Sequence, residues 1–153
     1  MSITKSFFYL FNRVRRSLEW RLGRFLMSVN GVTYGKDLIV RGRLFLNVGA
    51  EANVSIGDGC VFSSGAGLNP LSRNIMASIT VEDNASLRIG HGCGFSSCCL
   101  WAHEDITIGN NVNIGADTLI FDSDAHSLSF IDRRDIVLDM ANKMNSPIVI
   151  KDD

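Results

Sequence analysis

The segments "VSIGDGCVFSSG" (54–65), "LRIGHGCGFSSC" (87–98) and "ITIGNNVNIGAD" (106–117) are three versions of one short unit. Within a unit, apolar residues recur every six positions, as Ile56 and Phe62 do in the first. A period of six differs from the helical period of about 3.6 and from the alternation of a single strand. It predicts short strands joined by tight turns, with one residue of each strand pointing into a common interior.

Internal repetition is typical of solenoid folds, and six-residue repeats are typical of β-helices. Residues 38–53 fit an earlier and less regular coil, whereas 67–78 are expected to form a loop between two coils. We therefore expect an all-β solenoid over 31–153, preceded by a helix over 1–30. The repeat lapses at about 122–147, which predicts a polar excursion before the coil pattern resumes.

Composition narrows the class of protein. The chain has 153 residues and a net charge of −1, so it fits one domain and gives no global basis for binding nucleic acid. Its four cysteines fit neither a zinc site nor a small disulfide scaffold. We expect them to be reduced and buried, with no bound metal, in a cytoplasmic protein. These cysteines are Cys60, Cys93, Cys98 and Cys99.

The segment 5–28 carries an apolar stripe with helical spacing. Six basic residues against Glu19 give residues 1–28 a net charge of +5, which leaves −6 for the rest of the chain. Charges interrupt the apolar residues too often for a signal peptide or a transmembrane span. Two interpretations stay open: the helix packs on the protein body or another subunit, or it makes peripheral contact with the anionic inner face of a membrane. The stripe consists of Phe7, Phe11, Val14, Leu18, Leu22 and Phe25.

A longer pattern points to a family. The segment "IGNNVNIGADTLIFDSDAHSL" (108–128), followed by "DRR" (132–134) and "SPIVIKDD" (146–153), resembles the hexapeptide-repeat acyltransferases. The closest subgroup is the sugar and polysaccharide O-acetyltransferases related to maltose, galactoside and xenobiotic acetyltransferases. The resemblance covers about 38–153. It implies a left-handed parallel β-helix, a homotrimer with active sites between subunits, and acetyl-CoA as the acyl donor.

His126 is the expected catalytic residue. Acyl transfer to a hydroxyl needs a base for the hydroxyl proton, and an imidazole suits that role. The resemblance places the catalytic histidine at His126, and a carboxylate should orient its other nitrogen. Asp124 and Asp122 are the local candidates, and Asp124 is preferred because it shares a face with His126 in an extended chain. Alternatively, the six-residue phase that starts at Ile108 and passes through Ile120 ends on His126, which would make it an inward-facing structural histidine.

Acceptor binding is expected near the turn before the third unit. The resemblance implies that this region helps to bind the acceptor sugar, which makes Ser97, His103 and Glu104 candidate substrate-binding residues. Trp101 fits either a sugar-stacking role or the core, and the core is preferred because Trp101 aligns with the inward position of Ile120. The sequence assigns no residue to acetyl-CoA.

Several functions remain open at this stage. The leading hypothesis is an acetyl-CoA-dependent O-acetyltransferase that acts on a sugar or surface-polysaccharide hydroxyl. The alternatives are an amino-sugar N-acetyltransferase and a truncated, non-catalytic β-helix for assembly or membrane binding. A metal-dependent, carbonic-anhydrase-like β-helix needs a closely spaced histidine pair, and the three histidines are far apart. The family pattern continues past the position of Asp153 with coils that bind acetyl-CoA, so we expect a truncated chain with weak or no activity.

Overall fold

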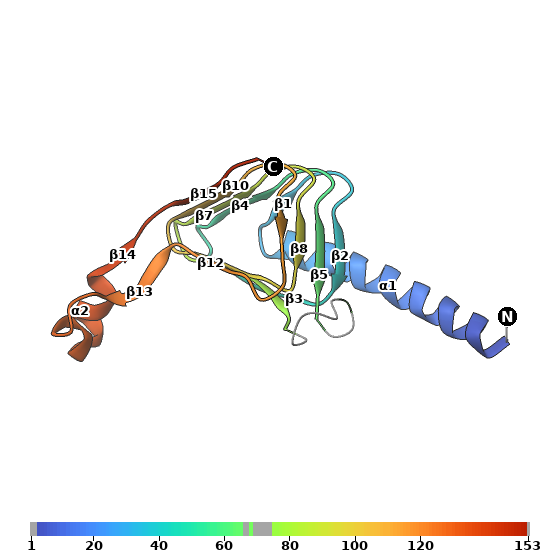
Figure 1. The fold of residues 1–153 in the computed structure, drawn as a ribbon, viewed down its shortest axis with the longest axis horizontal. Coiled ribbons are helices and arrows are strands. Elements are labelled where there is room, and N and C mark those ends of the chain that lie inside the picture. The colour runs from blue at the N-terminus through green and yellow to red at the C-terminus, as the bar shows by residue number, and fades with distance from the viewer. Residues whose placement is uncertain (1–2, 66–67, 69–74, 153) are drawn as a thin grey trace.

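A computed structural model gives the fold and describes residues 3–65, 68 and 75–152. The protein is mostly β, with parallel sheets of stacked strands and one N-terminal helix, α1 (Ile3–Val29) (Figure 1). Among the described residues, no helix is both long enough and apolar enough to cross a membrane. Most of the loop expected at 67–78 lies outside the described residues, and Ala77 and Ser78 begin a strand.

Three parallel sheets take the strands of the chain in strict rotation. The first sheet contains β1 (Thr33–Tyr34), β4 (Asn53–Ile56), β7 (Ser86–Ile89), β10 (Asp105–Ile108) and β15 (Ile148–Ile150). The second contains β2 (Ile39–Gly42), β5 (Val61–Ser64), β8 (Gly94–Ser96) and β11 (Asn113–Ile114). The third contains β3 (Leu44–Val48), β6 (Ala77–Val81), β9 (Cys99–Ala102) and β12 (Leu119–Phe121). Each coil thus stacks on the previous one, an arrangement compatible with a β-helix.

The six-residue pattern forms the core. Ile56 pairs in register with Ile89, and Ile89 pairs with Ile108, so one apolar residue from each coil stacks on the next. Phe62 and Phe95 stack likewise, with ring centroids 4.6 Å apart and planes 10° from parallel. All five side chains are buried, which confirms the predicted inward positions.

The glycine after each buried isoleucine has a steric reason. A Cβ on Gly57 would lie 2.6 Å from the carbonyl oxygen of Gly90, and a Cβ on Gly90 would lie 2.6 Å from that of Gly109. Successive coils therefore approach too closely at this corner for any side chain. The Ile-Gly repeat is a consequence of stacking as well as of turn formation.

The expected core position of Trp101 is wrong. Its register partner is Phe121, while Leu100 pairs with Ile120 and takes the inward position. Trp101 points outward and is 36% exposed. Paired residues of β8 and β11 are 19 positions apart in the sequence, whereas paired residues of β9 and β12 are 20 apart. The reason is that the turn before β12 is one residue longer than the turn before β9. This single residue shifts the alignment by one and reverses the face.

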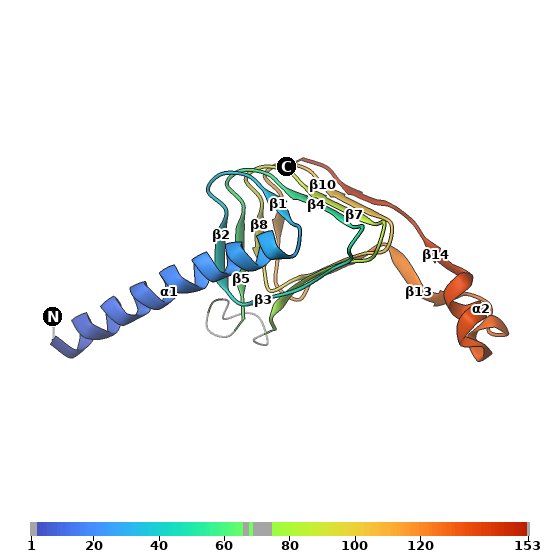
Figure 2. The same cartoon turned by 180° about the vertical axis from the view of Figure 1, so that it is seen from behind.

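The C-terminal third of α1 is fixed to the first coil. Trp20 donates its indole N–H to the carbonyl of Leu38 at 2.6 Å, and Met27 is fully buried. Gly23 lies against Val40 so closely that a Cβ would approach Val40 Cγ1 to 2.5 Å. Figure 2 shows this part of α1 crossing the coil stack near β2, while the N-terminal half projects away from it.

The predicted excursion is present and projects from the other end of the molecule (Figures 1 and 2). It contains β13 (Ser123–Ser127), a 3₁₀ turn (Asp132–Arg134), α2 (Ile136–Ala141) and β14 (Lys143–Asn145). The strands β13 and β14 pair antiparallel, unlike those of the three stacked sheets. The antiparallel pair carries the chain out and back, so that β15 can rejoin the first sheet beside β10.

Candidate functional site

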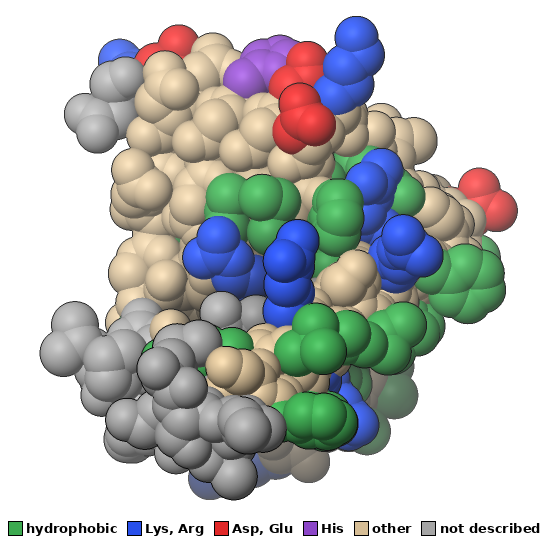
Figure 3. All heavy atoms as spheres, turned by 90° about the vertical axis from the view of Figure 1, so that its right-hand side faces the viewer, with side chains coloured by type: hydrophobic (Ala, Val, Ile, Leu, Met, Phe, Trp, Pro, Cys, Tyr) green, Lys and Arg blue, Asp and Glu red, His purple; other side chains and the backbone are tan. Residues whose placement is uncertain are grey.

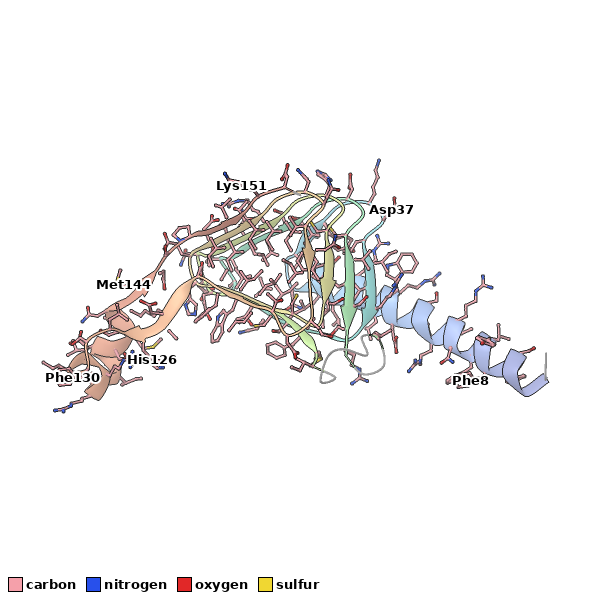
Figure 4. The ribbon with its side chains drawn as sticks, viewed as in Figure 1. Phe8, Asp37, His126, Phe130, Met144 and Lys151 are labelled. Atoms are coloured by element: carbon pink, nitrogen blue, oxygen red, sulfur yellow. The ribbon has the colours of Figure 1, made fainter. Side chains whose placement is uncertain are left out.

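His126 lies on the excursion and is paired with a carboxylate from α2. Its Nδ1 lies 2.7 Å from Oδ2 of Asp139. The other oxygen of that carboxylate accepts the backbone N–H of Ser127 at 2.8 Å. Asp139 is 4% exposed, whereas the His126 side chain is 59% exposed. The buried carboxylate of Asp139 thus holds the accessible imidazole of His126. Figure 4 shows His126 at the end of the molecule opposite Phe8.

The pairing affects the pKa of Asp139 and the hydrogen-bonding roles of the two ring nitrogens of His126. The hydrogen bond with His126 holds the pKa of Asp139 below its usual range, helped by the Ser127 N–H and against the effect of burial. An ionised carboxylate only accepts, so the neutral imidazole donates from Nδ1 and keeps its lone pair on Nε2. An exposed ring nitrogen with a lone pair is the arrangement that a general base requires.

Local interactions hold the two elements together. Asp135 caps α2 by accepting the backbone N–H of Val137 at 2.9 Å. Arg133 donates its Nε–H to the carbonyl oxygen of Ser127 at 2.6 Å, and the Ser127 hydroxyl lies 3.1 Å from Asp132 Oδ2. The excursion therefore orders itself largely through polar contacts around the residue that follows His126.

The expected partner of His126 is corrected by this geometry. Asp139, and not Asp124, is the carboxylate beside Nδ1, and Asp124 is exposed. The prediction assumed a regular extended chain, but Ala125 has a φ of 63° and β13 has an irregular register. The inward-facing alternative for His126 is also wrong, because the residue leaves the coil stack and is largely exposed.

Asp122 has a structural position at the corner from which the excursion departs. Its buried carboxylate accepts three consecutive backbone N–H groups, those of His103 at 2.6 Å, Glu104 at 2.9 Å and Asp105 at 2.8 Å. His103 and Glu104 form the turn between β9 and β10, and Asp105 is the first residue of β10. The carboxylate therefore joins the last corner of one coil to the next, and its position excludes it as the partner of His126.

His103 lies in an aromatic cluster beside the excursion. Its ring centroid lies 5.2 Å from those of Trp101 and Phe121, which are themselves 4.9 Å apart. Its Nδ1 lies 2.9 Å from Nζ of Lys143, so the lysine donates and the imidazole accepts. Burial, followed by the charge of Lys143, lowers the pKa of His103. The Nε2 atom is buried and has no hydrogen-bond partner among the described residues.

The other predicted acceptor residues are divided between the two ends of β9. Glu104 is exposed and follows His103 at the corner that leads to the excursion. Ser97 is buried in the turn before β9, where its hydroxyl lies 3.4 Å from the N–H of Gly65. Since the length of β9 separates Ser97 from that corner, Ser97 does not lie with His103 and Glu104.

Sequence reasoning missed Asp139 and Lys143. Lys143 faces Ser127 across the β13–β14 pair and reaches His103, so it connects the excursion to the aromatic cluster. Both residues come after the repeat has stopped, where no period predicts which side chains meet. The capping pattern of Asp135 before an apolar run was the available signal for α2 and thus for a helical residue opposite β13.

A large cavity lies away from His126. It has a volume of about 740 Å³ and runs between α1 and β3, with a mainly apolar lining that includes Leu18 and Leu44. The site at His126 is an exposed surface by comparison. Among the described residues, no group of three His, Cys, Asp or Glu side chains is placed to hold a metal ion.

Comparison with known proteins identifies no relative of this chain. No protein-family model, curated protein or solved structure matches the chain.

Proposed function

We propose that the protein is an acetyl-CoA-dependent O-acetyltransferase that acts on a hydroxyl of a sugar or surface polysaccharide. The observation that carries the proposal is the accessible imidazole of His126, held through Nδ1 by the buried carboxylate of Asp139. The motif that contains His126 and its resemblance to the hexapeptide-repeat acyltransferases support the choice of reaction. With this function we propose the finer fold of that family, a left-handed parallel β-helix, a rare exception to right-handed crossovers.

The proposed reaction assigns a proton path to His126. Its Nε2 takes the proton of the acceptor hydroxyl while the oxygen attacks the thioester carbonyl, so that a C–O bond forms. The C–S bond then breaks, and the imidazolium returns the proton to the leaving thiolate. Asp139 keeps the correct tautomer and stabilises the imidazolium while the proton is on Nε2. We assign none of the described residues to the binding of acetyl-CoA itself.

Acceptor binding is proposed at the corner that joins the coil stack to the excursion. Trp101 is exposed there, and its indole N–H donates to Glu82 at 2.9 Å, which holds the ring in place. A fixed, exposed indole offers the flat apolar face on which sugar rings stack. His103 and Glu104 stay in the proposal as neighbouring polar groups, whereas buried Ser97 is left out of it.

The resemblance to the hexapeptide-repeat acyltransferases implies a homotrimer, and the surface of the excursion supports the proposal of an assembly. The apolar side chains of the excursion are largely exposed, and a monomer rarely leaves such a patch uncovered. The exposed residues are Leu128, Phe130, Ile131, Ile136, Val137 and Met144. A neighbouring copy seated on this patch would bring its own surface next to His126. We place the assembly in the cytoplasm, where the free cysteines would stay reduced.

The test is the thiol released from acetyl-CoA in the presence of sugar acceptors. Replacing His126→Ala removes the base, and we expect a rate about a hundred- to ten-thousandfold lower. His91→Ala is the matched control, because His91 is an exposed histidine on a turn of the coil stack and should leave the rate unchanged. Equal rates for the wild type and His126→Ala would overturn the proposed mechanism.

The same assay separates the alternative functions. Acceptors with a free amine in place of the hydroxyl distinguish N-acetylation from O-acetylation. A non-catalytic assembly or membrane-binding module predicts no thiol release from the wild type and an unchanged assembly in His126→Ala.

A further inference from the structure

The N-terminal half of α1 exposes an unusual amount of apolar surface. The helix packs against β2 and β3, and the fixed contacts described above begin at Trp20. Before that point its large apolar side chains are exposed, although Phe11, Val14 and Leu18 also line the open cavity between α1 and β3. The exposed set is Phe7, Phe8, Tyr9, Leu10, Phe11, Val14 and Leu18. A long stretch of helix thus projects from the coil stack with its apolar side chains in solvent (Figures 1 and 4).

The tip of α1 is apolar on all sides. The five consecutive residues 7–11 are 58–75% exposed, and five residues complete more than one helical turn. A protein partner that packs against one face would leave the remaining apolar side chains of the tip in water. A medium that surrounds the helix covers them all, and a helix that is apolar all round is normally buried in such a medium.

Positive charge follows the tip immediately. Arg13, Arg15 and Arg21 are exposed along the next three turns, and residues 1–28 carry a net charge of +5 while the rest of the chain carries −6. Figure 3 looks toward the end from which α1 projects and shows Lys and Arg side chains next to hydrophobic ones. An apolar tip followed by a basic belt matches the depth profile of an anionic bilayer, with acyl chains below charged headgroups.

We propose that α1 anchors the protein to an anionic lipid bilayer. Residues 7–11 enter the boundary of the acyl chains, and Arg13 and Arg15 lie among the phosphate headgroups. The indole of Trp20 and the buried Met27 transmit this anchoring to the coil stack, because they hold the C-terminal part of the helix rigidly on it. The anchor is independent of the proposed acetyl transfer and does not rest on it.

Charge argues against a second copy of α1 as the occupant. Two copies that pair through this helix would bring segments of net charge +5 together, and the arginines beside the stripe would repel one another. Anionic headgroups instead neutralise the same arginines, and each basic residue near such a surface contributes about 1 kcal/mol. The lipid surface therefore satisfies both the apolar and the charged parts of the helix.

Vesicle flotation with the full-length protein tests the proposal. The two probes are vesicles of phosphatidylcholine alone and vesicles of phosphatidylcholine mixed with phosphatidylglycerol. We expect binding to the mixed vesicles, weaker binding to phosphatidylcholine, and release from the mixed vesicles as salt screens the charges. No binding to the mixed vesicles at low salt would overturn the proposal.

A matched pair of variants locates the contact. Phe8→Asp puts a charge in place of an exposed aromatic ring that the bilayer would bury, and we expect the affinity for vesicles to be at least about tenfold lower. Val149→Asp also places an aspartate at an exposed apolar position, on β15 at the far end of the coil stack from α1, and should leave vesicle binding unchanged. Equal losses in both variants would overturn the assignment to α1. A smaller oligomer for Phe8→Asp, without loss of vesicle binding, would identify a second copy as the occupant and overturn the proposal too.

Reversing the charge of arginines on α1 provides a second test of the bilayer contact. The double variant Arg13→Glu with Arg15→Glu should weaken binding to the mixed vesicles by more than about tenfold while changing binding to phosphatidylcholine little. Both arginines are exposed, so the helix should keep its fold. Unchanged affinity for the mixed vesicles would contradict the headgroup contact.

Discussion

Asp139 connects protonation to the order of the excursion. Its carboxylate is buried and accepts from both the His126 ring and the Ser127 backbone. Loss of its charge on protonation would weaken both hydrogen bonds at once. The residue is therefore expected to affect stability as well as the orientation of His126.

The pH dependence of stability follows from the lowered pKa of Asp139. A carboxyl group whose pKa is lower in the folded state stabilises the fold above its unfolded pKa of about 4, and the contribution is lost as the pH falls through the folded value. We expect the unfolding free energy of the wild type to exceed that of Asp139→Asn at neutral pH, and the difference to shrink below about pH 4. Chemical denaturation of both proteins at several pH values measures it. Parallel curves down to strongly acidic pH would contradict the prediction.

Stacked apolar side chains stabilise the coils as elements. Phe62 and Phe95 belong to adjacent strands and stack face to face in the interior. Each coil buries its inward residues against the next, as solenoid repeats do. The loss of one stacked side chain should therefore weaken two coils.

Phe95→Ala tests the contribution of this stack. Removal of a buried phenylalanine leaves a cavity and typically costs about 3–5 kcal/mol of unfolding free energy. Phe45→Ala is the control, since Phe45 is half-exposed on β3 and its loss should cost no more than about 0.5 kcal/mol. Denaturant titration of the three proteins gives the comparison, and equal stabilities of the two variants would refute the prediction.

At the scale of the whole molecule, the described residues form two large exposed apolar regions, which lie at opposite ends. One is the projecting half of α1, and the other is the excursion that carries His126 (Figure 4). The proposals assign the first region to a lipid surface and the second to neighbouring copies of the chain. These assignments predict different consequences for the same chemical change.

Ile136→Asp tests the trimer at the excursion. Ile136 is largely exposed on the first turn of α2, and a charge there should dissociate an assembly that buries it. Sedimentation equilibrium should give three times the monomer mass for the wild type and for Phe8→Asp, and a lower mass for Ile136→Asp. A wild-type protein that sediments as a monomer would rule out the trimer.

The stacked strands, most of their inward residues, the helix before them and the position of the excursion could all be predicted from the amino-acid sequence. These features are local: a six-residue period repeats the same turn, as in Ile56-Gly57 and Ile89-Gly90, and each coil needs only its neighbour. The outward position of Trp101 could not be predicted, because one extra residue in a turn of the folded coil reverses the face of the strand. The contact between Asp139 and His126 could not be predicted either, since it depends on where the antiparallel strands and α2 return, outside any repeat.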